Sequence, residues 1–212
     1  DLKRFDEAQK AANLFFNEAD KADYSYLDYM YYGHLLDALK KYDEAVVQYE
    51  KAIELDSTKT DLYQNISTVY EQKNDYKKAI DAYKKYITSL DKEKQTVDLQ
   101  YQLGRLYYGA GTHADSLSTT DAADRKHALV KADSVFAVVA EVNPDSYVGN
   151  FWRARSNSAL DPETTDGLAK PFYEKVATLL EGKKDARYNS ALIECYSYLG
   201  YYYLVTDKLP ES

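Results

Sequence analysis

Cysteine, proline, glycine and long apolar runs are all scarce in this sequence of 212 residues. Its single cysteine, Cys195, excludes a disulfide within the chain. Only four prolines and eight glycines interrupt the chain, and this scarcity suits an all-helical fold with few turns. No run of about 18 apolar residues occurs, so the sequence predicts no segment that spans a bilayer.

Basic residues are also in deficit. The chain has 27 Lys and Arg against 35 Asp and Glu, which gives a formal net charge of −8. Binding to duplex DNA or to an anionic membrane surface needs a basic patch, so this balance predicts neither a nucleic-acid partner nor direct membrane insertion. No signal peptide or lipid-attachment motif is visible.

Tyrosine, by contrast, is abundant, with 23 copies, and part of it belongs to a repeated pattern. The segment Lys41–Asp56 carries a sequence pattern that recurs in the segment beginning at Asn74. Equivalent residues of the two copies, such as Ala45 and Ala79, are 34 residues apart. In four successive repeats, at the same phase, an alanine is followed four residues later by an aromatic residue, and Leu-Gly-x2-Tyr occurs in two places. These matches are Ala45–Tyr49, Ala79–Tyr83, Ala132–Phe136, Ala169–Tyr173, Leu103–Tyr107 and Leu199–Tyr203.

A 34-residue period with these marks resembles the tetratricopeptide repeat family. The resemblance implies an all-α fold, an α-α superhelix of about ten antiparallel helices. First helices would line a concave groove and second helices the outer face. It also implies a scaffold that binds a protein or extended peptide in the groove and has no catalytic apparatus of its own. Glycine in the middle of a first helix, such as Gly33, would allow the paired helices to approach closely.

The repeat phase divides the chain into four whole repeats with half-repeats at both ends, and we expect the chain to be a segment of a longer protein. We predict a second helix of a truncated repeat in 1–25, repeats in 26–59 and 60–93, a repeat with an inserted loop at about 109–127 in 94–146, a repeat in 147–183, and a long first helix in 184–212.

Helical phase predicts which side chains face the groove. The first half of this face is mildly acidic, and the second half is aromatic with two arginines, which are residue types enriched in binding hot spots. The alternative for Trp152 and some tyrosines is packing between repeats. The predicted groove residues are Met30, Tyr31, His34, Gln64, Thr68, Tyr101, Arg105, Tyr108, Phe151, Trp152, Arg155 and Tyr201.

Three functions stay open at this point. The first is a non-enzymatic adaptor for a protein or peptide, and the second is a carbohydrate-binding module that uses exposed aromatic rings. The third is self-association through the unpaired helices at the two ends. No catalytic motif, cofactor motif or metal-ligand spacing is present, so we predict no enzyme and no cofactor.

The prediction of the cellular compartment depends on a resemblance alone. Ala132–Phe136, Asn143–Ser146 and Phe151–Ala154 resemble exported tetratricopeptide proteins of Gram-negative envelopes. The resemblance implies a periplasmic or envelope location, with any export signal upstream.

Overall fold

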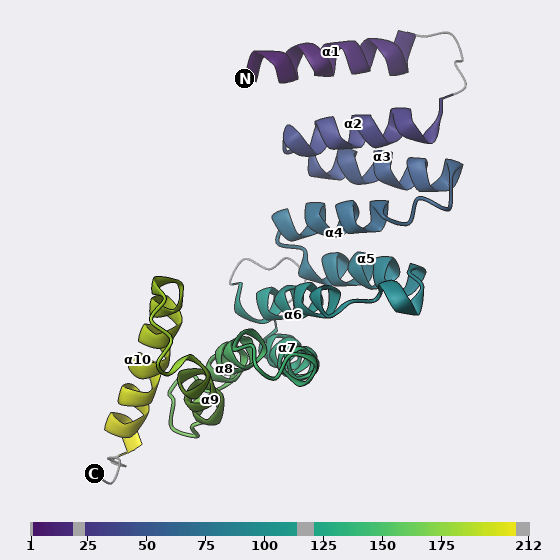
Figure 1. Cartoon of the computed structure of the whole chain (residues 1–212). Coiled ribbons are helices and arrows are strands. Elements are labelled where there is room, and N and C mark those ends of the chain that lie inside the picture. The colour runs from purple at the N-terminus through teal and green to yellow at the C-terminus, as the bar shows by residue number, and fades with distance from the viewer. Residues whose placement is uncertain (1, 19–23, 114–120, 207–212) are drawn as a thin grey trace. The chain divides into compact units, whose positions relative to one another are not determined.

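A computed structural model describes residues 2–18, 24–113 and 121–206 (Figure 1). This part of the chain contains ten α-helices and no strand, which confirms the all-α prediction. The chain divides into two compact units, residues 1–92 and 93–212. The helices are α1 (Leu2–Glu18), α2 (Tyr26–Ala38), α3 (Tyr42–Leu55), α4 (Leu62–Gln72), α5 (Tyr76–Ser89), α6 (Val97–Thr112), α7 (Ala122–Val142), α8 (Val148–Leu160), α9 (Lys170–Leu180) and α10 (Asn189–Thr206).

Helices α2 to α5 form two antiparallel pairs in the first unit, and these pairs follow the predicted stripes. Ala45, Tyr49 and Ala52 of α3 are fully buried, as the 3–4 spacing of α3 requires. The ring of Tyr49 covers Gly33 of α2 so closely that a Cβ built there would lie 2.7 Å from a ring carbon. Glycine therefore sets the distance between these two helices.

The turns that follow α2 and α4 have the same geometry, 34 residues apart. Lys40 and Asn74 both have φ near +58°, in the left-handed region. In each turn the next amide donates a hydrogen bond back across the helix end, Lys41 N to Leu36 O at 2.8 Å and Asp75 N to Tyr70 O at 2.9 Å. This arrangement satisfies carbonyls that the helix end leaves without partners.

Helix α1 contacts α2 through a small aromatic cluster. Phe16 stacks on Tyr32, with ring centroids 4.9 Å apart, and Tyr32 donates a hydrogen bond to Asn13 Oδ1 at 2.8 Å. Helix α1 lies in the segment 1–25, where a second helix of a truncated repeat was predicted, and residues 19–23 lie outside the described part of the chain.

The second unit begins with the pair α6 and α7, which repeats the glycine contact. A Cβ at Gly104 would lie 2.6 Å from the ring of Phe136. The predicted loop at 109–127 is shorter, because α6 continues to Thr112 and α7 begins at Ala122; residues 114–120 lie outside the described residues. The glycine-rich end of α6 stays helical where it packs on α7, and a Cβ at Gly111 would lie 2.5 Å from the Leu129 side chain.

Helix α7 begins at Ala122, directly after an aspartate. The Asp121 side chain caps this helix and accepts a hydrogen bond from the amide of Ala123 at 2.6 Å.

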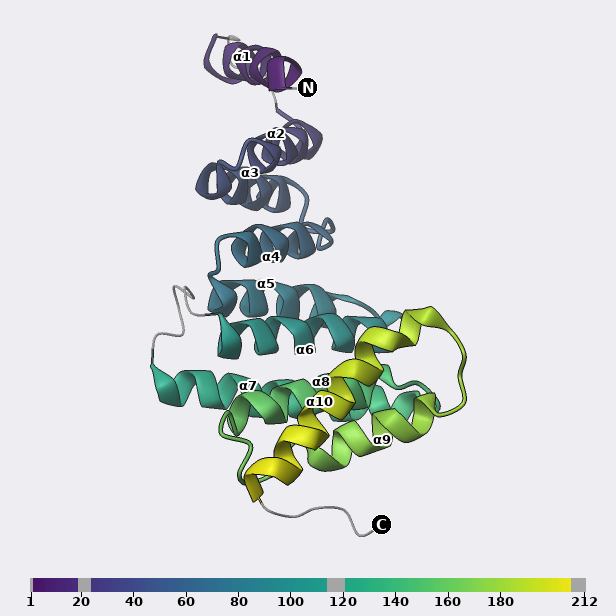
Figure 2. The ribbon, with the colours of Figure 1, turned by 90° about the vertical axis from the view of Figure 1, so that its left-hand side faces the viewer.

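Helices α8, α9 and α10 complete the second unit, and in Figure 2 α10 crosses over α8. Helix α9 begins at Lys170 and has a proline in its first turn, where the missing amide proton costs no hydrogen bond. One face of α10 packs on α9 and the turn that precedes it. Its buried residues, four along one stripe, are Ala191, Cys195, Tyr198 and Tyr202.

Candidate functional site

A cavity of about 520 Å³ opens between helices of the second unit. Helices α6, α8, α9 and α10 all contribute side chains to its wall, together with the turn that follows α8. Two of the predicted groove residues, Tyr108 and Arg155, are among them. The lining residues are Tyr108, Arg155, Ser158, Ala159, Pro162, Tyr173 and Glu194.

An ion pair across two helices fixes one side of this cavity. Arg155 of α8 donates from Nε and Nη2 to the two carboxylate oxygens of Glu194 in α10, at 2.8 and 2.6 Å. Tyr173 of α9 donates its hydroxyl proton to the same carboxylate at 2.9 Å. Bidentate pairs of this kind are among the stronger hydrogen bonds in proteins, so the three side chains hold each other in place.

The tyrosines beside this pair are held neutral. Burial raises the pKa of Tyr108, the Arg155 charge lowers it and the Glu194 charge raises it further. Burial, with the Glu194 carboxylate second, also raises the pKa of Tyr173 well above its usual value. Both hydroxyls therefore remain hydrogen-bond donors at neutral pH.

Two aromatic rings pack against the guanidinium of Arg155. Its central carbon lies 4.4 Å from the ring centroid of Phe151 and 5.1 Å from that of Trp152, within the range of cation–π attraction. Trp152 stacks on Phe136 at 5.4 Å, and Tyr101 and Tyr108 meet it edge-on at 6.0 and 5.2 Å. Trp152 therefore packs within an aromatic cluster instead of presenting a free flat ring.

The structure thus brings together five of the seven groove residues predicted in this unit, namely Tyr101, Tyr108, Phe151, Trp152 and Arg155. Arg105 lies on the same helix as Tyr101 but is exposed, and its guanidinium makes a long 3.5 Å contact with Gln102. Tyr201 is half exposed on α10 and does not line the cavity.

The five groove residues predicted in the first unit lie on α2 and α4. His34 Nδ1 is hydrogen-bonded to the hydroxyl of Tyr49 at 2.9 Å, so this histidine is tied to the core. Met30 packs against the core, whereas Tyr31, Gln64 and Thr68 are exposed.

Glu194 is the charged residue of this site that sequence reasoning missed. A usable signal was present, because it is the only charged residue in α10, and a lone carboxylate in an apolar helix requires a partner. Its cationic partner is 39 positions away in sequence, and helical phase alone does not join them.

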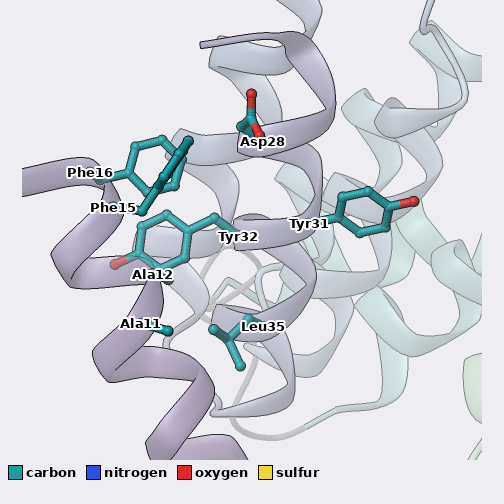
Figure 3. Close-up of a pocket in the computed structure, with 8 residues that line it drawn as sticks. All are labelled: Ala11, Ala12, Phe15, Phe16, Asp28, Tyr31, Tyr32 and Leu35. Atoms are coloured by element: carbon teal, nitrogen blue, oxygen red, sulfur yellow. The ribbon is translucent and has the colours of Figure 1, made fainter. Parts of the chain in front are cut away.

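Two smaller cavities lie elsewhere. One, of about 340 Å³, lies beside Tyr101 and the end of α7. The other, of about 290 Å³, lies between α1 and α2, and Figure 3 shows Phe15 and Phe16 beside Tyr32 at its wall. In the described residues, no helix has both the length and the apolar character to cross a membrane, and no three potential ligands are grouped to hold a metal ion.

Comparison with known proteins identifies the family. The tetratricopeptide repeat profile matches residues 29–59 and 60–89. The C-terminal part of a TPR repeat-containing protein from Cytophaga hutchinsonii is 32% identical; the match covers 98% of this chain and 72% of that chain, with a TM-score of 0.70. The chain belongs to the tetratricopeptide repeat family.

Two more distant tetratricopeptide structures are also similar to the chain. A thermophilic protein of Thermus thermophilus is 20% identical over 86% of this chain and 90% of that chain, with a TM-score of 0.48. YrrB, described as having an unusual peptide-binding site, is 19% identical over 96% and 93%, also with a TM-score of 0.48. No curated protein matches the sequence.

Membership has a general consequence for function. Tetratricopeptide repeats generally mediate protein–protein interactions, and proteins of this family are generally scaffolds without enzymatic activity. The resemblance to Gram-negative envelope proteins stays a prediction.

Proposed function

We propose that this tetratricopeptide protein is a non-enzymatic scaffold that binds an extended peptide segment of a partner protein in the cavity beside Arg155. The observation that carries the proposal is the Arg155–Glu194–Tyr173 network, which joins three helices around an open space of about 520 Å³. A site whose side chains are already fixed loses little conformational entropy when a ligand enters, so it retains more of the binding energy.

The chemistry of the cavity suits a peptide. A guanidinium has five N–H donors, and Arg155 gives two of them to Glu194. The Arg155–Glu194 pair therefore offers the remaining guanidinium N–H donors next to the lone pairs of the carboxylate. A peptide amide group complements this arrangement, because its carbonyl accepts from the guanidinium and its N–H donates to the carboxylate. Tyr108 and Ser158 add hydroxyls at the wall, and Ala159 and Pro162 provide apolar contact.

The single tryptophan gives a direct measurement of binding at this place. Trp152 contacts both Tyr108 and Arg155, so a ligand in the cavity changes its fluorescence. We would select linear peptides from a random library on the 212-residue chain and titrate the selected peptides while recording Trp152 emission. Two variants would be compared with the native chain, Ser158→Arg, which fills the cavity, and Ser134→Arg, which adds the same charge on an exposed face of α7.

The expected result is a change in emission on binding, with affinity reduced at least tenfold by Ser158→Arg and unchanged by Ser134→Arg. Circular dichroism would establish that both variants keep the native helix content. Equal affinity of the two variants, or failure to select any peptide, would overturn the proposal. The groove residues predicted on α2 and α4 would be a separate binding face, which this experiment does not require.

A further inference from the structure

The cavity of about 340 Å³ beside Tyr101, here called the Tyr101 cavity, shares no lining residue with the cavity beside Arg155. It opens where α6 begins, α7 ends and α8 begins. Ligand pockets generally measure about 300–1,000 Å³, so this one is small and has room for a single long side chain. Three valines and a tyrosine ring form apolar walls around a carboxylate, an amide and a hydroxyl. The lining residues are Val97, Asp98, Tyr101, Val139, Asn143, Ser146 and Val148.

The turn after α7 at this cavity has the same hydrogen bond as the turn after α3. In the turn after α3, the amide of Lys59 donates to Asp56 O at 3.1 Å. In the turn after α7, the amide of Ser146 donates to Asn143 O at 3.0 Å. Asp56 and Asn143 are the residues that end the two helices. Serine therefore stands in the second unit at the position that a lysine occupies in the first.

The Lys59 side chain shows which groups attract a cation beside such a turn. Its Nζ lies 4.7 Å from the ring centroid of Tyr26, the first residue of α2, and 3.7 Å from Asp56 Oδ2. The ring face and the carboxylate both favour a positive charge. The hydroxyl of Ser146 instead accepts a hydrogen bond from the amide of Val148 at 3.3 Å, and the Tyr101 cavity lies open beside it.

The Tyr101 cavity offers the same kinds of partner to a basic side chain from outside. Asp98 is exposed in the first turn of α6, and within the described residues its carboxylate has no basic partner. Asn143 adds an amide oxygen, and the Ser146 hydroxyl has a second lone pair that can accept a hydrogen bond. The valines suit the methylene stem of a lysine or arginine, which packs along apolar surface while its charged end stays polar.

Trp152 lies between this cavity and the cavity beside Arg155. Its ring centroid is 6.0 Å from that of Tyr101 and 5.2 Å from that of Tyr108, which lines the other cavity. The two tyrosines are seven positions apart on α6, which is about 10 Å along a helix that rises about 1.5 Å per residue. An extended peptide advances about 3.3 Å per residue, so about three of its residues span this distance.

We propose that the Tyr101 cavity receives a lysine or arginine side chain of the peptide that binds beside Arg155. The stem packs against the valines and the Tyr101 ring, and the charged end meets Asp98 and Asn143. This inference rests on the proposed function for the source of the side chain. It describes the partner as a segment with a basic residue about three positions from the part held beside Arg155. The formal net charge of −8 favours the approach of such a segment.

Blocked amino acids test the Tyr101 cavity without any peptide. N-acetyl-lysine amide and N-acetyl-norleucine amide have similar shapes and differ in charge. Each would be titrated into the ¹⁵N-labelled chain while the amide chemical shifts are recorded. The lysine probe should give saturable shifts at Asp98, Asn143 and Ser146, with an affinity about three- to fivefold above that of the norleucine probe, as expected for an ion pair at a surface. Asp98→Asn should remove this preference.

Ser146→Lys supplies the missing lysine from the chain itself. Its side chain should enter the cavity, as Lys59 approaches Tyr26 in the first unit, and lower the affinity for the lysine probe at least fivefold. Val142→Lys is the control, because it adds the same charge at an exposed position that does not line the cavity. This variant should bind the lysine probe within about twofold of the native chain, and circular dichroism would establish that both variants are folded.

Equal affinity for the lysine and norleucine probes would overturn the proposal. So would the absence of saturable shifts at the cavity, or equal binding of the lysine probe by Ser146→Lys and Val142→Lys. These outcomes are separate from a failure of the proposed function, because Ser158→Arg should abolish peptide binding beside Arg155 and leave binding of the lysine probe unchanged. Peptides that bind beside Arg155 but show no excess of lysine or arginine would overturn the basic anchor alone.

Discussion

The ring of Tyr49 lies on Gly33 at a distance that excludes any side chain there. A Cβ would lie 2.7 Å from ring carbon Cε1, and the ring is fully buried and has no free space to move into. Glycine within a helix lowers stability by about 1 kcal/mol relative to alanine. The close packing of Tyr49 on α2 offsets this loss at Gly33.

We therefore predict that Gly33→Ala destabilises the chain despite its better helix propensity. Overpacking of about 1–3 kcal/mol, less about 1 kcal/mol of propensity, leaves a net loss of up to about 2 kcal/mol. Urea unfolding monitored by circular dichroism measures this loss. Gly200→Ala is the matched control, because nothing lies near that position, and it should stabilise the chain by up to about 1 kcal/mol. If Gly33→Ala had the same free energy of unfolding as Gly200→Ala, the packing argument would be refuted.

The helix pairs were predictable because their determinants are local. A stripe such as Ala45, Tyr49 and Ala52 follows from a period of 3.6 residues, and the 34-residue repeat shows which stripes belong together. The Arg155–Glu194 pair was not predictable in the same way. It joins α8 to α10, which are the first helices of two successive repeats, and α9 lies between them in the chain. No residue spacing within one repeat therefore reveals this pair.

The inserted segment of the third repeat was only partly predictable, for a similar reason. Its glycine-rich composition is typical of a loop, and residues 109–127 were expected to form one. Gly109 and Gly111 are nevertheless helical, since tertiary packing against α7 overrides their low helix propensity. Contacts between helices are needed to decide such a case.

The Arg155–Glu194 pair should make a measurable contribution to stability. Each side chain is about one-third exposed, which moderates the interaction, but the geometry is bidentate. A double-mutant cycle with Arg155→Met and Glu194→Gln should give a coupling energy of about 1–2 kcal/mol by urea unfolding. The Arg187–Asp185 pair is more exposed and should show little coupling. Equal coupling in the two cycles would show that burial of the first pair is unimportant.

The turn after α2 contains a residue with an unfavourable backbone conformation. Lys40 has φ near +58°, where side chains other than those of Asn and Asp are disfavoured, whereas Asn74 occupies the same position one repeat later. Lys40→Asn should stabilise the chain by about 0.5–1 kcal/mol, and Asn74→Lys should destabilise it by a similar amount. Thermal unfolding of the two variants tests this pair of predictions. A shift of the same sign in both would contradict the backbone explanation.

Alkaline pH should destabilise the second unit through its buried thiol. Burial, with the Glu194 charge second, raises the pKa of Cys195 from 9.0 to about 12. The unfolded chain therefore loses this proton at lower pH than the folded chain, so stability is complete below pH 9 and falls as the pH rises toward 12.

The single cysteine makes the effect separable from that of the tyrosines. Between about pH 8 and pH 10 the thiol should account for a loss of about 1.4 kcal/mol, on the basis of about 1.36 kcal/mol per pKa unit. The tyrosines contribute equally to the native chain and to Cys195→Ala, so the difference between their two pH dependences isolates the thiol. Urea unfolding at both pH values should show the shallower decline in Cys195→Ala. Parallel declines would mean that the Cys195 thiol ionises as readily in the folded chain as in the unfolded one.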